Sequence, residues 1–595
     1  MSVKIISRSE KTDSIEQCDY INELHPVLQK VYKSRGISHK KHLEKELVNI
    51  LPYNTLKDID KAVDCIIEKI LNNQLIMIVG DFDVDGATST ALAVLVLKAF
   101  GAKKVDFVIP NRFDFGYGLT PKLVESIKKH NPSLLVTVDN GIASVDGVKA
   151  ANDLGINVVV TDHHLPAETS PDAVAIVNPN QNGDVFPSKN LAGVGVTFYV
   201  LLALRAKLKE IGWFDKNKIK IPNMARYLDL VALGTVGDLV PLDHNNRTLV
   251  SYGLGLIRQS ACREGIKALL RLGKRELKKV VASDLGFAVG PRLNAAGRLE
   301  DMALGVECLL ADNIHTAQNV AQELDALNYE RRQIEADMKL EAMEYLKQKY
   351  NDPKLAPVGL CLHNDNWHQG VIGIVSSRVK DLYHRPVFIF ANDGDEYIKA
   401  SGRSIKGLHL KELLDKINKL EPDLLIKYGG HAMAAGLSIR KDNFDKFEKL
   451  FIQVITDILK GNTDILSKII ETDGELGHAD FNLDLARLMK YAEPWGQEFP
   501  EPVFHGKFKV VEQKIVAEKH LKLRLEPIFD ILNNSDKANN QVSGKVVLNA
   551  IAFNIDREKW PNYNTNIANI VYKLDINVYS GLTSLQLLID YIEAI

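Results

Sequence analysis

The chain has 595 residues, of which 46% are hydrophobic and 25% charged, and its formal net charge at pH 7 is −2. This composition is typical of a globular protein, and no apolar stretch approaches the roughly 20 residues that a membrane-spanning helix needs. The near-zero net charge excludes a global attraction to nucleic acid, so any polyanion would have to be held by local basic groups.

The length predicts roughly three or four domains. Residues 1–10 lack the long apolar segment and the small-residue cleavage site of a secretory signal, so we expect a cytoplasmic protein. The five cysteines are scattered, odd in number and never spaced as CxxC, which argues against disulfides and structural zinc. We expect buried thiols at Cys18, Cys65, Cys262, Cys308 and Cys361.

The first part of the chain predicts a short extension followed by an α/β domain. Residues 1–48 carry few turn signals and several charges, which is typical of a helical extension without a functional role. From 49 to 315, apolar strand-like runs alternate with helical stretches such as 87–100. This alternation predicts a parallel sheet. The predicted strands are 76–80, 105–110, 134–138 and 158–161.

Three acids follow the first predicted strand at every second position: Asp81, Asp83 and Asp85, which end at Gly86. Side chains of extended backbone alternate between faces, so these three carboxylates would point the same way. Three carboxylates so close together repel one another unless a cation lies between them. The alternative is a solvated acidic turn or a helix N-terminus with surplus capping acids.

Further polar clusters follow other apolar runs that we interpret as strands. The run 134–138 ends in Asp139, the run 156–161 ends in Asp162, and the run 228–237 ends in Asp238. Because ligand groups gather at the carboxyl ends of parallel strands, one shared site is expected. It would hold Asp81, Asp83, Asp85, Asp139, His163, His164 and Asp238. These are too many acids for one ion but suit two ions, the arrangement used for in-line attack on phosphorus.

The second half of the chain predicts three further parts. Residues 316–350 contain no Gly or Pro and favour one long helix that connects domains, with a coiled-coil dimer arm as the less favoured alternative. A second α/β segment follows at 351–460. Short alternating runs at 508–511, 546–551 and 572–578 predict a small β-barrel within 461–595.

Four motifs in order resemble the DHH phosphoesterase superfamily: DFDVDG at 81–86, NRF with GYG at 111–118, DNG at 139–141 and DHH at 162–164. Within it, LGTVGDLVPL at 233–242 and GPRLNAAGRL at 290–299 most resemble the RecJ family of single-strand-specific 5′ to 3′ DNA exonucleases. The segments at 367–378, 400–404 and 429–436 are similar to the DHH-associated substrate-binding domain. The resemblance therefore implies two α/β domains with parallel-type sheets joined by a long helix, plus a C-terminal OB-like barrel that binds nucleic acid.

The resemblance also implies roles for the clustered residues. It makes Asp83, Asp85, Asp139, His163 and Asp238 metal ligands, Asp81 a ligand or a supporting group, and His164 a residue that faces the substrate. It implies two Mn²⁺ ions, with Mg²⁺ as the alternative, and carboxylates mixed with imidazole but without thiolate agree with this choice. Asn111 and Arg112 resemble the phosphate-contacting pair of the family, although Arg112 alone could form a surface salt bridge.

Two more groups of residues are predicted to bind the substrate. Arg292 and Arg298 lie among small residues, where either phosphate contact or helix packing is expected. In the second segment, two loops of small residues could grip a terminal 5′ phosphate, or could simply form turns. They contain Ser401, Arg403, Gly429, Gly430 and His431.

The sequence therefore predicts a manganese-dependent exonuclease that releases mononucleotides from the 5′ end of single-stranded DNA, in DNA repair and recombination. The resemblance implies single-stranded DNA, a single-strand-binding protein and a helicase as partners, and we expect a monomer. One alternative is a DHH phosphoesterase that acts on oligoribonucleotides or cyclic dinucleotides. Another is a replication scaffold of the same fold that has lost catalysis.

Overall fold

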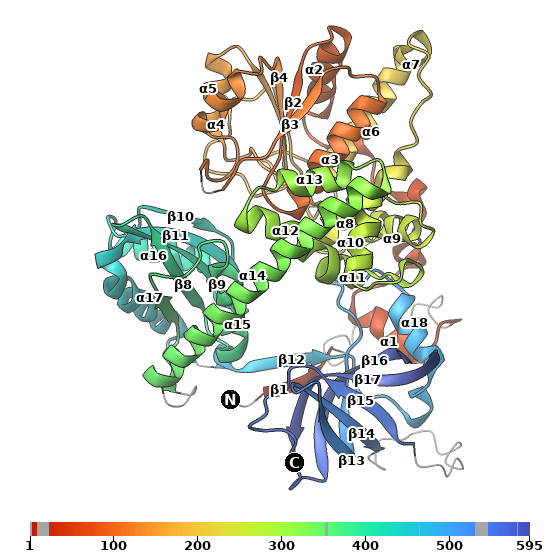
Figure 1. Ribbon diagram of the computed structural model, residues 1–595, viewed down its shortest axis with the longest axis vertical. Coiled ribbons are helices and arrows are strands. Elements are labelled where there is room, and N and C mark those ends of the chain that lie inside the picture. Colours follow the sequence, from red (N-terminus) through yellow and green to blue (C-terminus); the bar gives the residue numbers. More distant parts are fainter. Residues whose placement is uncertain are drawn as a thin grey trace. The chain divides into compact units, whose positions relative to one another are not determined.

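The computed structural model describes residues 3–8, 23–112, 114–350, 355–462, 464–529, 546–579 and 581–595 (Figure 1). Cys18 and part of the segment 1–10 lie outside these residues. The chain divides into two compact units, which are described separately. One consists of 1–4, 292–301 and 322–470, and the other of 5–291, 302–321 and 471–595.

A five-stranded parallel sheet in the order β3-β2-β4-β5-β6 organises the larger unit. The strands are β2 (Ile76–Val79), β3 (Val105–Val108), β4 (Leu134–Val138), β5 (Asn157–Thr161) and β6 (Ala175–Val177). β2 and β4 are buried along their whole length, as the continuous apolar runs of a covered parallel sheet require. Four of the five strands predicted in this domain, at 76–80, 105–110, 134–138 and 158–161, are confirmed.

Helices follow the strands and supply the core with apolar side chains. Those associated with the sheet are α2 (Ile59–Leu71), α3 (Val84–Ala99), α4 (Pro121–Lys128), α5 (Val145–Asp153) and α6 (Gly193–Glu210). After them come α7 (Trp213–Lys216), α8 (Leu228–Gly237), α9 (His244–Arg258), α10 (Glu264–Leu272), α11 (Ala282–Asp284), α12 (Gly290–Leu299) and α13 (Ala303–Leu310).

The strand predicted at 228–237 is wrong, because this run forms the helix α8. The helix is buried on nearly every side, so its sequence shows no polar face that would reveal a helical period. Gly234 lets α8 approach α3 closely, since a Cβ at this position would lie 2.7 Å from Asp85 Oδ1. The helix therefore still delivers Asp238 to the carboxyl ends of the strands.

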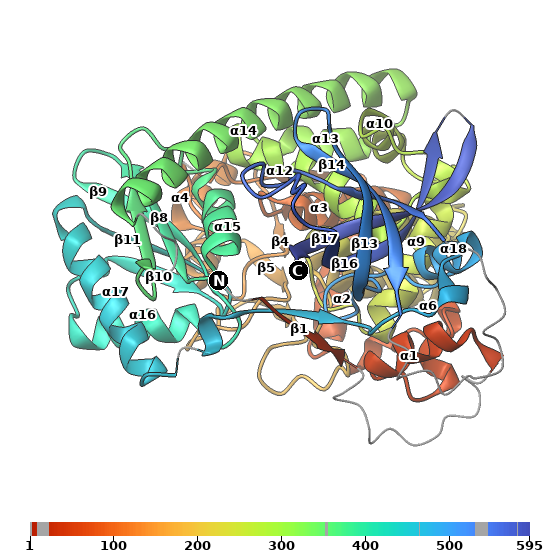
Figure 2. The same cartoon turned by 90° about the horizontal axis from the view of Figure 1, so that it is seen from below.

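The long helix predicted at 316–350 is confirmed as α14, Ile314–Lys349, which Figure 2 shows as one uninterrupted rod. Its first turns, up to Ala321, belong to the larger unit and the remainder to the smaller one. Ala342 and Leu346 of its later turns are buried in a core with Leu360 and Val387.

The second α/β domain contains a five-stranded sheet in the order β10-β11-β9-β8-β7. Its strands are β7 (Leu360–His363), β8 (Val387–Asp393), β9 (Tyr397–Arg403), β10 (Lys427–Gly430) and β11 (Ala434–Arg440). Its helices are α15 (Ile372–Tyr383), α16 (Leu410–Leu420) and α17 (Phe444–Leu459). The α/β class is confirmed, but this sheet is mixed rather than parallel: only β7 and β8 pair in parallel, because short hairpins connect β8 to β9 and β10 to β11.

The C-terminal part forms a closed barrel in the order β13-β14-β15-β17-β16. Its strands are β13 (Phe504–Val516), β14 (His520–Ile528), β15 (Leu548–Ala552), β16 (Ile567–Tyr579) and β17 (Leu582–Ala594). β13 pairs with both β14 and β16, which closes the barrel. The three strand-like runs predicted in this segment fall on β13, β15 and β16. The helix α18 (Leu483–Tyr491) precedes the barrel.

The N-terminal extension is only partly helical. It contains α1 (Pro26–Ser34), as the prediction of a helical extension requires, but β1 (Val3–Ser7) is a strand that pairs with β12 (Lys468–Thr472). Arg35 of this extension forms a buried ion pair with Asp473 at 2.6 Å. Cys65, Cys262, Cys308 and Cys361 are buried thiols, as expected. None of the described helices combines the length and the apolar character that crossing a membrane requires.

Candidate metal centre

The first acidic cluster lies in the turn between β2 and α3. Asp83 is the N-cap of α3, and its Oδ1 accepts hydrogen bonds from the backbone N–H groups of Asp85 and Gly86 at 2.9 and 3.0 Å. The extended alternation predicted for these acids is therefore wrong, because Asp85 lies in the first helical turn. The capping role raised as the alternative applies to Asp83.

Two close approaches keep this turn compact. A Cβ at Gly86 would lie 2.6 Å from backbone atoms of Asp81, so only glycine lets the helix begin this close to the acids. Asp85 is fully buried, and its carboxylate accepts hydrogen bonds from the N–H groups of Gly193 and Val194 at 2.6 and 3.0 Å. The start of α6 is thereby fixed to the acidic turn.

Asp139 follows β4 directly and has a left-handed backbone conformation, with φ of 62°. Its N–H donates to Thr161 O at 3.0 Å, and the side chain of Asn140 donates to Val79 O at 3.0 Å. These bonds join the carboxyl ends of β2, β4 and β5. Gly193 is packed against Asp139, since a Cβ there would lie 2.6 Å from Asp139 Oδ1.

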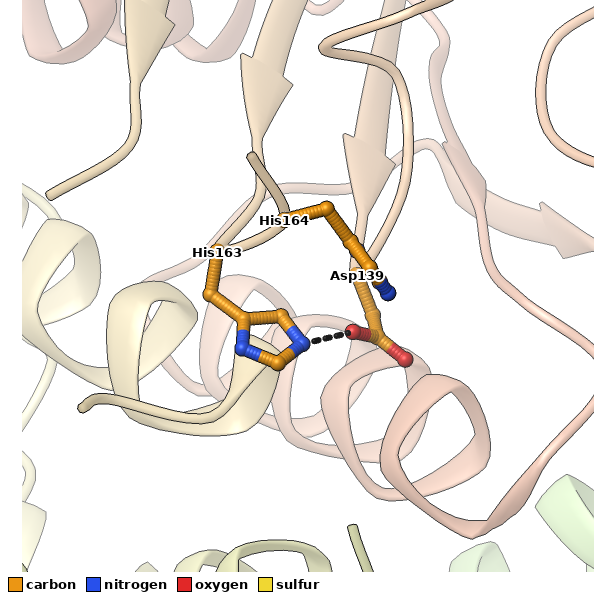
Figure 3. A group of neighbouring side chains, drawn as sticks. All are labelled: Asp139, His163 and His164. Carbon is orange, nitrogen blue, oxygen red and sulfur yellow. Dashed lines mark ion pairs between the residues drawn. The ribbon is translucent and has the colours of Figure 1, made fainter. Parts of the chain in front are cut away.

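His163 joins acids that come from different elements. Its Nε2 lies 3.2 Å from Asp139 Oδ1 and 3.4 Å from Asp238 Oδ2. Figure 3 shows the imidazole turned toward the Asp139 carboxylate. The structure thus brings together the ends of β4, β5 and α8, which lie far apart in sequence.

Among the described residues, three groups of side chains have ligand atoms within 4.8 Å of one another and could each hold a metal ion. All seven residues of the predicted site are members. The groups are Asp139, His163 and His164; Asp85, His163 and Asp238; and Asp81, Asp83 and Asp139. Asp139 and His163 each belong to two groups, as bridging or neighbouring ligands would.

His164 is oriented by Asp162, a residue to which the sequence interpretation gave no role. Asp162 Oδ1 lies 2.7 Å from His164 Nδ1 and accepts the backbone N–H groups of His163 and His164 at 2.7 and 3.1 Å. Burial lowers the pKa of His164, but the hydrogen bond and the charge of Asp162 outweigh burial and raise it to about 9. Asn178 and Asn180 donate to the carbonyl groups of His164 and His163 and so hold the backbone of this turn.

Burial and mutual repulsion disfavour the ionised form of the clustered aspartates. Burial raises the pKa of Asp85 to about 7, and the charge of Asp83 adds to this effect. Burial first, and neighbouring carboxylates second, also raise the pKa values of Asp81, Asp139 and Asp238 well above the usual range. Hard carboxylate oxygens with imidazole and without thiolate are the donor set of Mn²⁺ or Mg²⁺ rather than of structural zinc. The residues present therefore fit a pair of hard divalent cations.

Arg112 lies beside the acidic turn. Its guanidinium is 4.1 Å from the ring centroid of Phe82. Burial lowers the pKa of Arg112, while the charges of Asp81 and Asp83 act in the opposite direction. Tyr117, from the GYG motif, also belongs to the site although the sequence gave it no role: its hydroxyl is 3.4 Å from His164 Nδ1. Asn111 begins the turn that carries Arg112, and its carbonyl accepts the N–H of Phe115 at 2.9 Å.

The remaining predicted residues lie in the smaller unit. Arg292 forms an ion pair with Asp325 at 2.7 Å, and Arg298 donates to Gly370 O at 3.2 Å. Both contacts are of the kind that the helix-packing alternative predicts. Binding of substrate by Arg292 and Arg298 stays a prediction.

Ser401 and Arg403 lie on β9, and Gly429 and Gly430 on β10, so the predicted loops are strands that both flank β11. The register places Gly436 of β11 between Ser401 and Gly429. His431 turns the chain into β11 through a hydrogen bond from its N–H to Ala434 O at 2.8 Å.

Arg403 is a half-buried cation at this sheet. Its Nη1 donates to Ser401 Oγ at 3.1 Å and to Gly402 O at 2.8 Å. Burial lowers its pKa, and no carboxylate of the described residues forms an ion pair with it. A Cβ at Gly373 would lie 3.1 Å from Arg403 Nη2, so the start of α15 also approaches this side chain. The arrangement suits an anionic group.

Comparison with known proteins agrees with this architecture. Three family models match: the DHH family, N-terminal domain, at 75–235; the DHHA1 domain at 354–457; and the RecJ OB domain at 472–591. The chain is 47% identical over 592 residues, and over 100% of both sequences, to the single-stranded-DNA-specific exonuclease RecJ of Escherichia coli. The chain belongs to the RecJ family.

Other RecJ proteins are similarly related. RecJ of Haemophilus influenzae is 48% identical over 96% of both chains. Among solved structures, RecJ of Thermus thermophilus in complex with Mn²⁺ matches with a TM-score of 0.76 and 26% identity, covering 99% of this chain and 79% of that one. Another RecJ exonuclease, bound to manganese, matches with a TM-score of 0.56 and 31% identity over 69% of this chain and 98% of that one.

Proposed function

We propose that this chain is a metal-dependent exonuclease that hydrolyses single-stranded DNA from its 5′ end and releases mononucleotides. The single observation that carries this proposal is the meeting of five aspartates and two histidines at the carboxyl ends of β2, β4, β5 and α8. Membership in a family whose members are named single-stranded-DNA-specific exonucleases supports the choice of substrate.

We infer that Asp83, Asp85, Asp139, His163 and Asp238 hold two Mn²⁺ ions, with Mg²⁺ as a substitute and Asp81 as a further ligand or a support. Asp139 and His163 each belong to two of the three groups of ligand atoms, and Asp139 is the better candidate for a shared ligand because a carboxylate has two oxygens that can bind two ions. When bound, the two ions supply an activated water and stabilise negative charge during in-line displacement at phosphorus. Related RecJ structures contain Mn²⁺ or Mg²⁺, which supports a site for hard divalent cations.

His164 and Arg112 would act on the phosphate directly. Asp162 holds Nδ1 of His164, which leaves Nε2 as the atom that can hold or transfer a proton. A pKa of about 9 keeps the metal-free imidazole protonated at neutral pH, so it can donate a hydrogen bond to an anionic oxygen. Arg112, fixed against Phe82, would neutralise the scissile phosphate, and Asn111 would support it.

Exonuclease action requires a site that recognises a chain end. We propose that Ser401, Arg403, Gly429, Gly430 and His431 bind the terminal 5′ phosphate, because Arg403 is a half-buried cation that forms no ion pair with a described carboxylate. Arg292 and Arg298 remain candidates for an additional phosphate contact. A role in DNA repair and recombination, a cytoplasmic location, a monomeric state, and a single-strand-binding protein and a helicase as partners belong to the same proposal.

The proposal is tested with single-stranded DNA labelled at the 5′ or the 3′ end, incubated with Mn²⁺ beside duplex, RNA and cyclic dinucleotide substrates. We expect immediate release of the 5′ label as a mononucleotide and a delayed release of the 3′ label. Asp139→Ala should abolish the reaction, while Asp106→Ala, at an exposed position on β3, should leave it unchanged. Preferential turnover of cyclic dinucleotides or RNA would favour the other phosphoesterase class, and inactivity on all substrates would favour a scaffold.

A further inference from the structure

A cavity lies at the amino ends of β2, β4 and β5, opposite to the candidate metal centre. Its volume is about 340 Å³, at the lower end of the range of roughly 300 to 1,000 Å³ that is typical of small-molecule sites. It is formed where the loops that lead into β2, β4 and β5 meet, at the amino ends of these strands. The metal centre occupies the carboxyl ends, so the two sites are separated by the length of the strands.

Two lysines give this cavity a positive charge. Lys69, in the last turn of α2, is 6% exposed, and its ion pair is with Glu68 Oε1 at 3.0 Å, a side chain that is itself 56% exposed. Lys128, in the last turn of α4, pairs in the same way with the exposed Glu125 at 3.3 Å. Both carboxylates can turn to solvent, and the described residues that line the cavity include no acid. A buried ammonium group in such a place is stabilised by an anion.

Polar groups complete the lining. Gln74 Oε1 is buried and accepts no hydrogen bond from the described part of the chain. An unsatisfied buried acceptor costs free energy, so a ligand that donates a hydrogen bond to this oxygen would be favoured. Asn131, Ser133 and Asn157 add side chains that can donate as well as accept.

We propose that this cavity binds a small phosphate monoester. The ammonium groups of Lys69 and Lys128 contact the phosphate oxygens, and Gln74 Oε1 accepts a hydrogen bond from a hydroxyl or protonated group of the ligand. Sulfate has the same size and charge as hydrogen phosphate but carries no proton at neutral pH, so it cannot satisfy Gln74. This site is independent of the metal centre and of the proposed exonuclease activity.

The test measures binding to the full-length, metal-free chain in EDTA by calorimetry, with inorganic phosphate, sulfate and deoxythymidine 5′-monophosphate as probes. We expect phosphate to bind more tightly than sulfate, and Gln74→Leu to remove that difference. Lys69→Met should weaken phosphate binding at least about tenfold, which corresponds to the loss of one charge-assisted hydrogen bond. The matched control Lys61→Met, on the same helix with a side chain that is 68% exposed, should bind as the wild type does.

A second variant and a lysine methylation experiment test whether the probe binds at this cavity. Lys128→Met removes the second charge at an exposed position, so it separates loss of binding from loss of folding. Methylation of Lys128, followed by mass spectrometry, should be slowed by the bound probe, while methylation of Lys61 should not. If deoxythymidine 5′-monophosphate binds more tightly than inorganic phosphate, the site recognises the organic part of the ligand as well. If the two bind equally, the site recognises the phosphate group alone. Absence of binding, or equal binding by Lys69→Met, Lys128→Met and the wild type, overturns the proposal.

Discussion

Replacing Asp85 by asparagine should stabilise the metal-free chain at pH 8 while destroying catalysis. Burial and the charge of Asp83 raise the pKa of Asp85 from 3.8 to about 7, so the folded protein binds a proton here that the unfolded chain releases. The stability that this group contributes is complete below pH 3.8 and is lost as the pH rises toward 7. At about 1.4 kcal/mol for each pH unit, the full loss is about 4 kcal/mol, of which about 2.5 kcal/mol falls between pH 5 and pH 8.

Asparagine carries no charge, so this loss does not occur in the variant. One of the N–H groups of Gly193 and Val194 will face the amide NH₂, at a cost of about 1 to 2 kcal/mol that does not depend on pH. The measurement is the free energy of unfolding in urea, with EDTA present, for the variant and the wild type at pH 5 and pH 8. The change in their difference between the two pH values gives the electrostatic contribution of Asp85. We expect that difference to move by about 2.5 kcal/mol in favour of the variant at pH 8. A difference that is the same at both pH values would refute the reasoning.

Two other substitutions test individual contacts. Arg112→Lys keeps the charge but loses the planar contact with Phe82 and the bidentate geometry, so we expect kcat on single-stranded DNA to fall about 10- to 100-fold at saturating Mn²⁺; an unchanged kcat would exclude Arg112 from phosphate contact. Gly193→Ala places a methyl group 2.6 Å from Asp139 Oδ1, so we expect a loss of about 1 to 3 kcal/mol of stability and weaker Mn²⁺ binding by calorimetry. The control is Gly255→Ala, where a Cβ meets no atom within 4 Å, and equal behaviour of the two variants would contradict this packing.

The parallel sheet could be predicted because its strands are short apolar runs that end in polar residues. The runs at 76–80 and 134–138 are rich in β-branched and other apolar residues, and both form buried strands. The run at 228–237 is also mostly apolar but has a smaller share of β-branched residues, and it forms a helix. A segment buried on all sides shows neither the period of two of a half-buried strand nor the helical period, so hydrophobicity alone could not separate the two cases.

Which residues come together as candidate metal ligands could be predicted better than how they do so. All seven residues meet, yet Asp83 and Asp85 reach the site from the start of a helix rather than from an extended strand. Sequence order cannot show that a single glycine, Gly86, lets the helix begin within the acidic run.

The supporting residues were missed for a different reason. Asp162 and Tyr117 belong to motifs that were recognised, but their roles depend on contacts with His164 that only the folded chain reveals. The prediction of a parallel second sheet failed because short hairpins reverse the chain between β8 and β9 and between β10 and β11.

The number of Mn²⁺ ions bound to each chain tests the central claim most directly. Equilibrium dialysis followed by electron paramagnetic resonance should show two ions in the wild type, with the magnetic coupling of neighbouring ions. Asp139→Asn should retain at most one ion because Asp139 belongs to two of the three groups, whereas Asp106→Asn should retain both. A wild-type chain that binds fewer than two ions, or an Asp139→Asn variant that still binds a coupled pair, would contradict the account.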